Sequence, residues 1–131
     1  MRILKYIFIL SVSIILFSCK KEKESFPVVT GTIILNVHAI HHSWDVSNVK
    51  IYIKANASVF PGADSTQYDR YIFSDGYGKV SFTQLTPGNY YIYASGFDAV
   101  WGANVIGYKL INLTKENLIN NEMSVTLYVS E

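Results

Sequence analysis

Cysteine and clustered charge are both scarce in this sequence. A single cysteine among 131 residues excludes an intrachain disulfide framework. The only short basic cluster, Lys20, Lys21 and Lys23, is interleaved with Glu22 and Glu24. Such a pattern gives no electrostatic support to a nucleic-acid partner. Half of the residues are apolar and 16% are charged, which is typical of one small globular domain.

Long amphipathic helices are also missing. Residues 114–121 form the only helical candidate, of one or two turns, with Thr114 as its cap. There is therefore no glycine-rich phosphate loop that opens a helix. The acidic residues are spread singly, and Asp75 fits a turn better than a catalytic site. We expect a protein that is not an enzyme and that holds no cofactor.

The first 18 residues have the pattern of an export signal. Residues 1–5 include two basic side chains, and residues 6–17 form an almost unbroken apolar run. About twelve residues are too few to span a bilayer core of about 30 Å as a helix. They have the length of the apolar region of a signal peptide. Residues 1–18 are thus predicted to be removed on export.

The end of this segment resembles the lipobox of bacterial lipoproteins. Leu16-Phe17-Ser18-Cys19 places an aliphatic residue at −3, a small residue at −1 and then the only cysteine. The resemblance implies cleavage before Cys19 and attachment of lipid to its sulfur. Residues 19–26 would be a lipidated, charged tether. The lack of aspartate directly after Cys19 implies, by the same resemblance, an outer-membrane anchor with the domain facing the periplasm or the cell surface.

Residues 27–131 show repeated period-two alternation between turn signals, which is typical of half-buried strands. The residues expected on inward faces are Ile33, Leu35, Val37, Ala39, Val49, Ile51, Ile53, Val80, Phe82, Leu85, Tyr90, Ile92, Ala94, Met123, Val125, Leu127 and Val129. Further strands are expected over residues 67–74 and 103–112, and turns at 75–78 and 87–88. This spacing predicts an all-β fold: an antiparallel, Ig-like or prealbumin-like sandwich of about seven strands.

One part of this domain resembles a known fold family. The segment Asp75-Gly76-Tyr77-Gly78-Lys79-Val80-Ser81-Phe82, followed by Leu85, Pro87-Gly88, Tyr90 and Ile92, is similar to the carboxypeptidase regulatory-like family of prealbumin-like sandwiches. Residues 31–33 and 48–53 resemble its opening strands. The resemblance implies an architecture, and it implies no single function because the family has many roles.

The three histidines suggest a metal site. His38, His41 and His42 lie within five residues, with Asp45 nearby. In a strand that continued through His42, His38 and His42 would share a face about 13 Å apart and His41 would point the other way. Only a sharp turn at Ile40 would bring the three rings together. A polar strand end with loop histidines is therefore the simpler interpretation.

Aromatic residues suggest a second kind of site. Trp44, Tyr52, Tyr91, Tyr93 and Trp101 could stack on a glycan or bind a peptide, since alternation places the three tyrosines on the outward side of their strands. Cross-strand packing is the alternative role for such tyrosines.

Three functional hypotheses follow. The first is a non-catalytic, membrane-anchored lipoprotein that serves as a structural or protein-interaction module of the cell envelope. The second is a surface lipoprotein that binds a glycan or another small ligand. The third is a lipoprotein that binds metal through its histidines.

Overall fold

The computed structural model describes residues 31–131. The export signal, Cys19 and the charged tether lie outside the described residues, so their assignment stays a prediction. Within residues 31–131, the structure has no helix whose length and hydrophobicity would let it cross a membrane.

The first of two sheets is built around β1 (Ile33–His41). β5 (Lys79–Leu85) pairs with it in antiparallel register, and β8 (Glu122–Tyr128) pairs with its other edge in parallel. The two-residue β2 (Trp44–Asp45) folds back on the end of β1. This sheet therefore joins the first and last strands of the domain.

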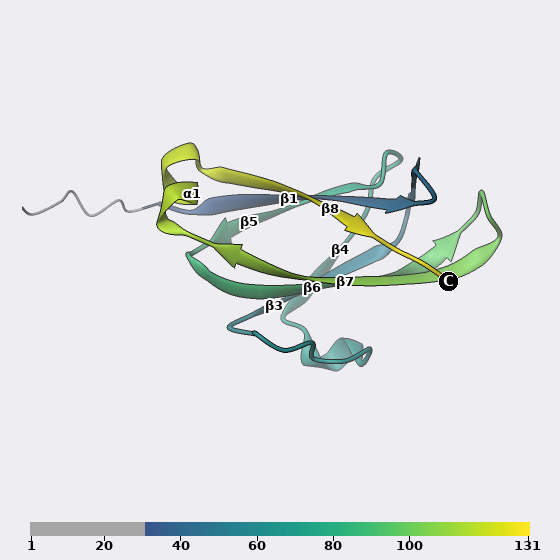
Figure 1. Cartoon of the computed structure of the whole chain (residues 1–131), viewed down its shortest axis with the longest axis horizontal. Helices are drawn as coiled ribbons and strands as arrows, with labels where there is room; N and C mark the ends of the chain where they lie inside the picture. The colour runs from purple at the N-terminus through teal and green to yellow at the C-terminus, as the bar shows by residue number, and fades with distance from the viewer. Residues whose placement is uncertain (1–30) are drawn as a thin grey trace, which may run out of the picture.

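The second sheet has four antiparallel strands in the order β4-β3-β6-β7. Their bounds are Lys50–Ala55 for β3, Arg70–Phe73 for β4, Gly88–Asp98 for β6 and Ala103–Leu113 for β7. The sheets form two layers, and α1 (Lys115–Asn120) lies at one end of them (Figure 1). The predicted all-β sandwich is confirmed. The parallel pairing of β1 with β8 was not predicted.

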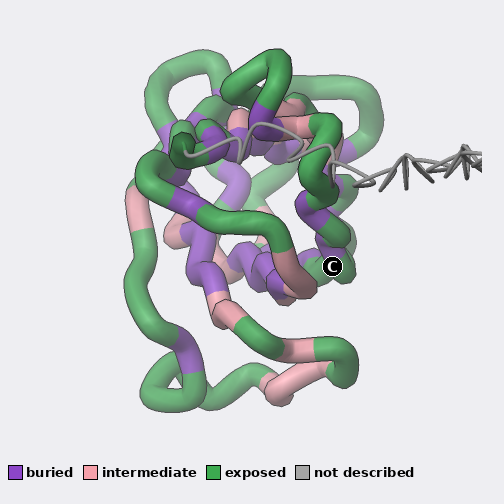
Figure 2. Tube along the Cα trace, turned by 90° about the vertical axis from the view of Figure 1, so that its left-hand side faces the viewer, coloured by how far each residue is buried: buried purple, intermediate pink, exposed green. Residues whose placement is uncertain are grey.

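The core lies between the layers, as the alternation predicts. Inward residues of β1, β3, β5, β6, β7 and β8 form one apolar cluster, and the buried segments run through the middle of the molecule (Figure 2). Phe82 and Leu85 both face inward although they are three positions apart, an odd number. Gln84 has a positive φ of 60°, and the pairing of β1 with β5 shifts register at this point. This bulge reverses the parity of the strand.

Two predicted elements differ in length from those observed. Residues 67–74 were expected to be one strand, but β4 covers only Arg70–Phe73. The preceding residues include the short 3₁₀-helix η1 (Ser65–Gln67), where the Asp64 side chain accepts hydrogen bonds from the amide and hydroxyl of Thr66. The predicted short helix is present as α1, and the amide of Thr114 donates to the side chain of Asn117 at 2.8 Å.

Candidate functional site

One end of the sandwich gathers chain segments that are far apart in the sequence. We call it the histidine end and define it by His41, His42, Asp98, Trp101 and Glu131. The β1–β2 turn, the β6–β7 connection and the C-terminus meet there, opposite α1 (Figure 1).

His41 lies inside the sandwich. It continues the inward parity of Ala39, and only 2% of its surface is exposed. Its Nδ1 lies 2.9 Å from Oδ2 of Asp98, another buried polar residue. Burial alone raises the pKa of Asp98, but hydrogen bonds from His41 and from the amides of Val100 and Trp101 outweigh burial and leave that pKa below its usual value.

The state of Asp98 determines which nitrogen of His41 is free. An ionised carboxylate can only accept hydrogen bonds, so Nδ1 of His41 donates to Asp98. In the neutral imidazole, Nε2 then keeps its lone pair. That atom is buried and has no hydrogen-bonding partner among residues 31–131. The arrangement leaves this lone pair available to accept a hydrogen bond or to bind a metal ion.

His42 is brought beside His41 by a tight turn. His42 and Ser43 have positive φ angles of 47° and 71°, so the chain reverses directly after β1. The ring centroid of His42 lies 4.2 Å from that of His41 and 4.7 Å from that of Trp101. The sharp turn at Ile40 that would be needed to unite all three rings is absent, and the turn two residues later unites only two of the three histidines.

His38 belongs to a different surface. Because it has the outward parity of β1, its Nε2 lies 2.7 Å from Oδ1 of Asp45 on the far side of the first sheet. It also lines a depression with Lys79, Ser81 and Ser124. The proposed trio of His38, His41 and His42 therefore does not come together in the structure.

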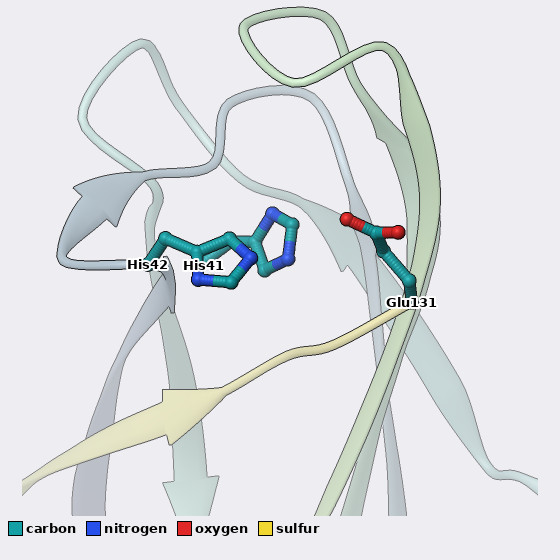
Figure 3. A group of neighbouring side chains, drawn as sticks. All are labelled: His41, His42 and Glu131. Carbon is teal, nitrogen blue, oxygen red and sulfur yellow. The ribbon is translucent and has the colours of Figure 1, made fainter.

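Glu131 is the third potential metal ligand, beside His41 and His42. One potential ligand atom from each of these three residues lies within 4.8 Å of the other two. The two imidazoles and the carboxylate point toward one another across the end of the sandwich (Figure 3). Sequence reasoning missed Glu131 because nearly ninety residues separate it from the histidines. No local pattern indicates that β8 ends beside the β1–β2 turn.

The tyrosines that alternation places on the outward side of their strands are largely covered. Tyr52 and Tyr93 point away from the core, yet they are only 9% and 4% exposed. The segment between β3 and β4 lies across the outer side of the second sheet (Figure 1), and its Phe60 and Tyr68 pack on the tyrosines. The Tyr68 ring lies 5.5 Å from Tyr52 and 5.6 Å from Tyr93. These outward tyrosines therefore form part of a second, smaller apolar cluster.

The segment between β3 and β4 that covers the tyrosines is held in place at Tyr68. Its hydroxyl donates to the backbone oxygen of Gly62 at 2.8 Å. Burial, together with the nearby Tyr93 and Tyr91, raises the pKa of Tyr68 to about 12. The covering segment is thus tied to itself and packed on the sheet.

The five aromatic residues do not share one surface. Trp44 and Trp101 are 61% and 50% exposed, and both lie near the β1–β2 turn. Tyr91 pairs with Leu110 at the other end of β6, half-buried beneath Phe60. The structure therefore separates the tryptophans from the tyrosines.

The second sheet exposes a different apolar set around the covered tyrosines. We call it the aromatic face and define it by six large side chains that are at least 44% exposed: Tyr71, Phe73, Phe97, Ile106, Tyr108 and Leu110. Ring contacts connect it to the cluster beneath the cover. Phe60 stacks on Tyr108 at 4.2 Å, and Tyr71 lies 5.4 Å from Tyr52.

The outer side of the first sheet is different in character. Its depression is lined by Asn36, His38, Lys79, Ser81 and Thr126, among others. Trp44 and Tyr128 are exposed toward the end of this sheet, so the two outward surfaces differ in their middle, where the first sheet is polar and the second is rich in rings.

Comparison with known proteins supports the architecture. No protein-family model matches the sequence, and no curated protein matches it. Two crystal structures of BcpA, the major pilin subunit of Bacillus cereus, one of them a variant, are similar in fold, with TM-scores of 0.51 and 0.50 at 12% and 13% identity. Each match covers 76% of this chain and 30% of the pilin chain. At such low identity the similarity shows the fold alone.

Proposed function

We propose that this chain is a non-catalytic, lipid-anchored module of the cell envelope that contacts another protein through the aromatic face. The exposure of the six large apolar side chains on one side of the second sheet is the observation that supports this role. Large apolar side chains exposed together on one side of a domain often mark a binding surface. Tyrosine and phenylalanine are also enriched where proteins meet.

The aromatic face is suited to binding because its rings are already ordered. Phe60 stacks on Tyr108 and Tyr71 contacts Tyr52. The ammonium of Lys50 lies 5.1 Å from the ring centre of Tyr71 and 5.5 Å from that of Phe73. Side chains held in this way lose little conformational entropy when a partner covers them.

The position of the chain ends fits an anchored module. β1 begins at the α1 end of the sandwich (Figure 1). The aromatic face lies on the outer side of the second sheet. A tether from Cys19 would enter at the α1 end. The aromatic face would then stay accessible to a neighbouring envelope protein.

Glycan binding is the alternative function. It would depend on Trp44 and Trp101, since the rings of Tyr52 and Tyr93 are covered and cannot stack on a sugar without displacement of Phe60 and Tyr68.

Site-specific photo-crosslinking in intact cells tests the proposal. A photoreactive phenylalanine analogue at Tyr108 is expected to give a discrete protein adduct. The matched control carries the analogue at Ser124, on the polar outer side of the first sheet, and is expected to give none. A third variant carries it at Trp101, on the surface that glycan binding would use.

The outcomes separate the hypotheses. A protease-sensitive adduct at Tyr108 that is absent at Ser124 supports a protein partner. Equal labelling at both positions, or no adduct at Tyr108, would contradict the role of the aromatic face. An adduct confined to Trp101 that glycosidases remove would favour the glycan alternative.

A further inference from the structure

We propose that His41, His42 and Glu131 form a binding site for a first-row divalent transition metal ion such as Zn²⁺, with Asp98 as a positioning residue. The site lies at the histidine end, apart from the aromatic face.

The first observation behind this proposal is the buried nitrogen of His41. Nε2 has no hydrogen-bonding partner within residues 31–131, and His41 is 2% exposed. Buried polar atoms are nearly always paired, because an unpaired one loses its water without compensation. Nδ1 is occupied by Asp98. Nε2 is therefore the nitrogen of His41 that remains available to bind an ion, and the His41 ring lies beside His42 and Glu131 (Figure 3).

The second observation is the partner behind His41. Histidines that bind metal usually donate their other N–H to a carboxylate, which fixes the tautomer and makes the ligand nitrogen more basic. Asp98 accepts from Nδ1 at 2.9 Å and is itself held by the amide of Val100 at 2.8 Å. The orientation required for binding through Nε2 is thus built into the fold.

The ligand atoms are close enough to converge. Ligands at 2.0–2.1 Å from a tetrahedral ion lie about 3.3 Å from one another. The three side chains here offer atoms within 4.8 Å of one another. His42 and Glu131 are exposed, so rotation of their side chains can close the remaining gap while His41 stays fixed.

The ligand set indicates the class of ion. Two imidazoles and one carboxylate suit Zn²⁺ and its neighbours, whereas Mg²⁺ and Ca²⁺ prefer oxygen ligands alone. Three protein ligands leave one position for water. Bound metal would tie Glu131, which follows β8, to the turn after β1. Because the ion binds the folded state, it should raise thermal stability.

Calorimetric titration with Zn²⁺ tests the site. The protein is the full chain without a polyhistidine tag, and every sample carries Cys19→Ser, so that no cysteine sulfur contributes. We expect one ion to bind per chain and the melting temperature to rise. His42→Ala and Glu131→Gln should each weaken binding at least tenfold. His38→Ala is the matched control: it removes an exposed imidazole that pairs with Asp45 and should leave the affinity unchanged.

Trp101 provides a readout at the site itself. The chain has two tryptophans, so Trp44→Phe makes Trp101 the only one. Cu²⁺ should quench its emission, because His42 lies against the indole, and Zn²⁺ should compete. Asp98→Asn, checked for folding by circular dichroism, is expected to lower the affinity by roughly 10–100-fold, the effect typical of losing such a partner.

Three results would overturn the proposal. The first is an absence of Zn²⁺ binding by the folded chain. The second is unchanged affinity in both His42→Ala and Glu131→Gln. The third is an equal loss of affinity in His38→Ala, which would show that scattered surface histidines bind the ion.

Discussion

At the residue scale, two His–Asp pairs show how much the environment of a side chain matters. His38 and Asp45 form an exposed pair at 2.7 Å, while His41 and Asp98 form a buried pair at 2.9 Å. The sequence alone does not tell the two pairs apart. Both histidines belong to β1, and both aspartates lie outside that strand. The parity of β1 assigns one pair to solvent and the other to the interior.

The buried pair should make stability depend on acid pH. The pKa of Asp98 lies below its ordinary value of 3.8. The unfolded chain therefore binds a proton at this position before the folded chain does, and acid favours unfolding. The stabilisation is fully present above about pH 4 and is lost as the pH falls through the folded pKa. One group of this kind contributes a slope of at most about 1.4 kcal/mol per pH unit.

Urea unfolding between pH 2 and pH 6 measures this effect. Asp98→Asn should lower stability at pH 6 and flatten the acid limb of the profile. Asp45→Asn removes the carboxylate of the exposed pair and is the matched control, with a profile expected to follow the parent chain. A parallel shift of the whole curve in Asp98→Asn, with its slope unchanged, would exclude Asp98 as the titrating group.

At the scale of elements, the sequence predicts what depends on neighbours along the chain. Alternation identifies the inward faces correctly, for example in Ile33–His41, because the strand buries one side against the core. It does not reveal that β8 pairs in parallel with β1, nor that Phe60 and Tyr68 cover outward tyrosines. Those contacts join distant segments, and tertiary packing decides them. The same reason explains why Glu131 was missed at the histidine end.

Gly107 allows the C-terminal segment to pack closely against β7. Ile106 and Ser130 exchange backbone hydrogen bonds of 2.9 and 2.8 Å. A Cβ added at the neighbouring Gly107 would lie 2.5 Å from the backbone oxygen of Tyr128 and 2.8 Å from Cγ1 of Val129. Real atoms do not approach so closely, so the C-terminal segment would have to move.

Gly107→Ala is therefore expected to destabilise the domain by about 1–3 kcal/mol, the usual cost of overpacking. Urea midpoints with unchanged m-values give the difference. Gly76→Ala is the control, since a Cβ there meets nothing within 4 Å. Equal urea midpoints for the two variants would show that the C-terminal segment is not tightly packed against Gly107. If the metal site exists, Gly107→Ala should also weaken it, because Glu131 follows the displaced segment.

At the scale of the whole molecule, the proposed anchor and the proposed metal site belong to opposite ends of the sandwich. β1 runs for nine residues, about 26 Å, from the α1 end to the histidine end. An anchor joined to the start of β1 would place the histidine end away from the membrane. The aromatic face extends between the ends. Under these proposals, attachment, protein contact and metal binding would use distinct regions of a small domain.

Attachment is tested at Cys19, the only cysteine in the sequence. Each buried methylene of an acyl chain contributes about 0.8 kcal/mol, and two or more chains give stable anchoring. Cys19→Ser should therefore move the protein from the membrane fraction to the soluble fraction, while Ser25→Ala in the same predicted tether should not. Metabolic labelling with a fatty acid should mark the parent chain and Ser25→Ala, but not Cys19→Ser. If Cys19→Ser stays in the membrane fraction after a high-pH wash, the aromatic face or an uncleaved segment holds the protein there, and the lipid anchor is wrong.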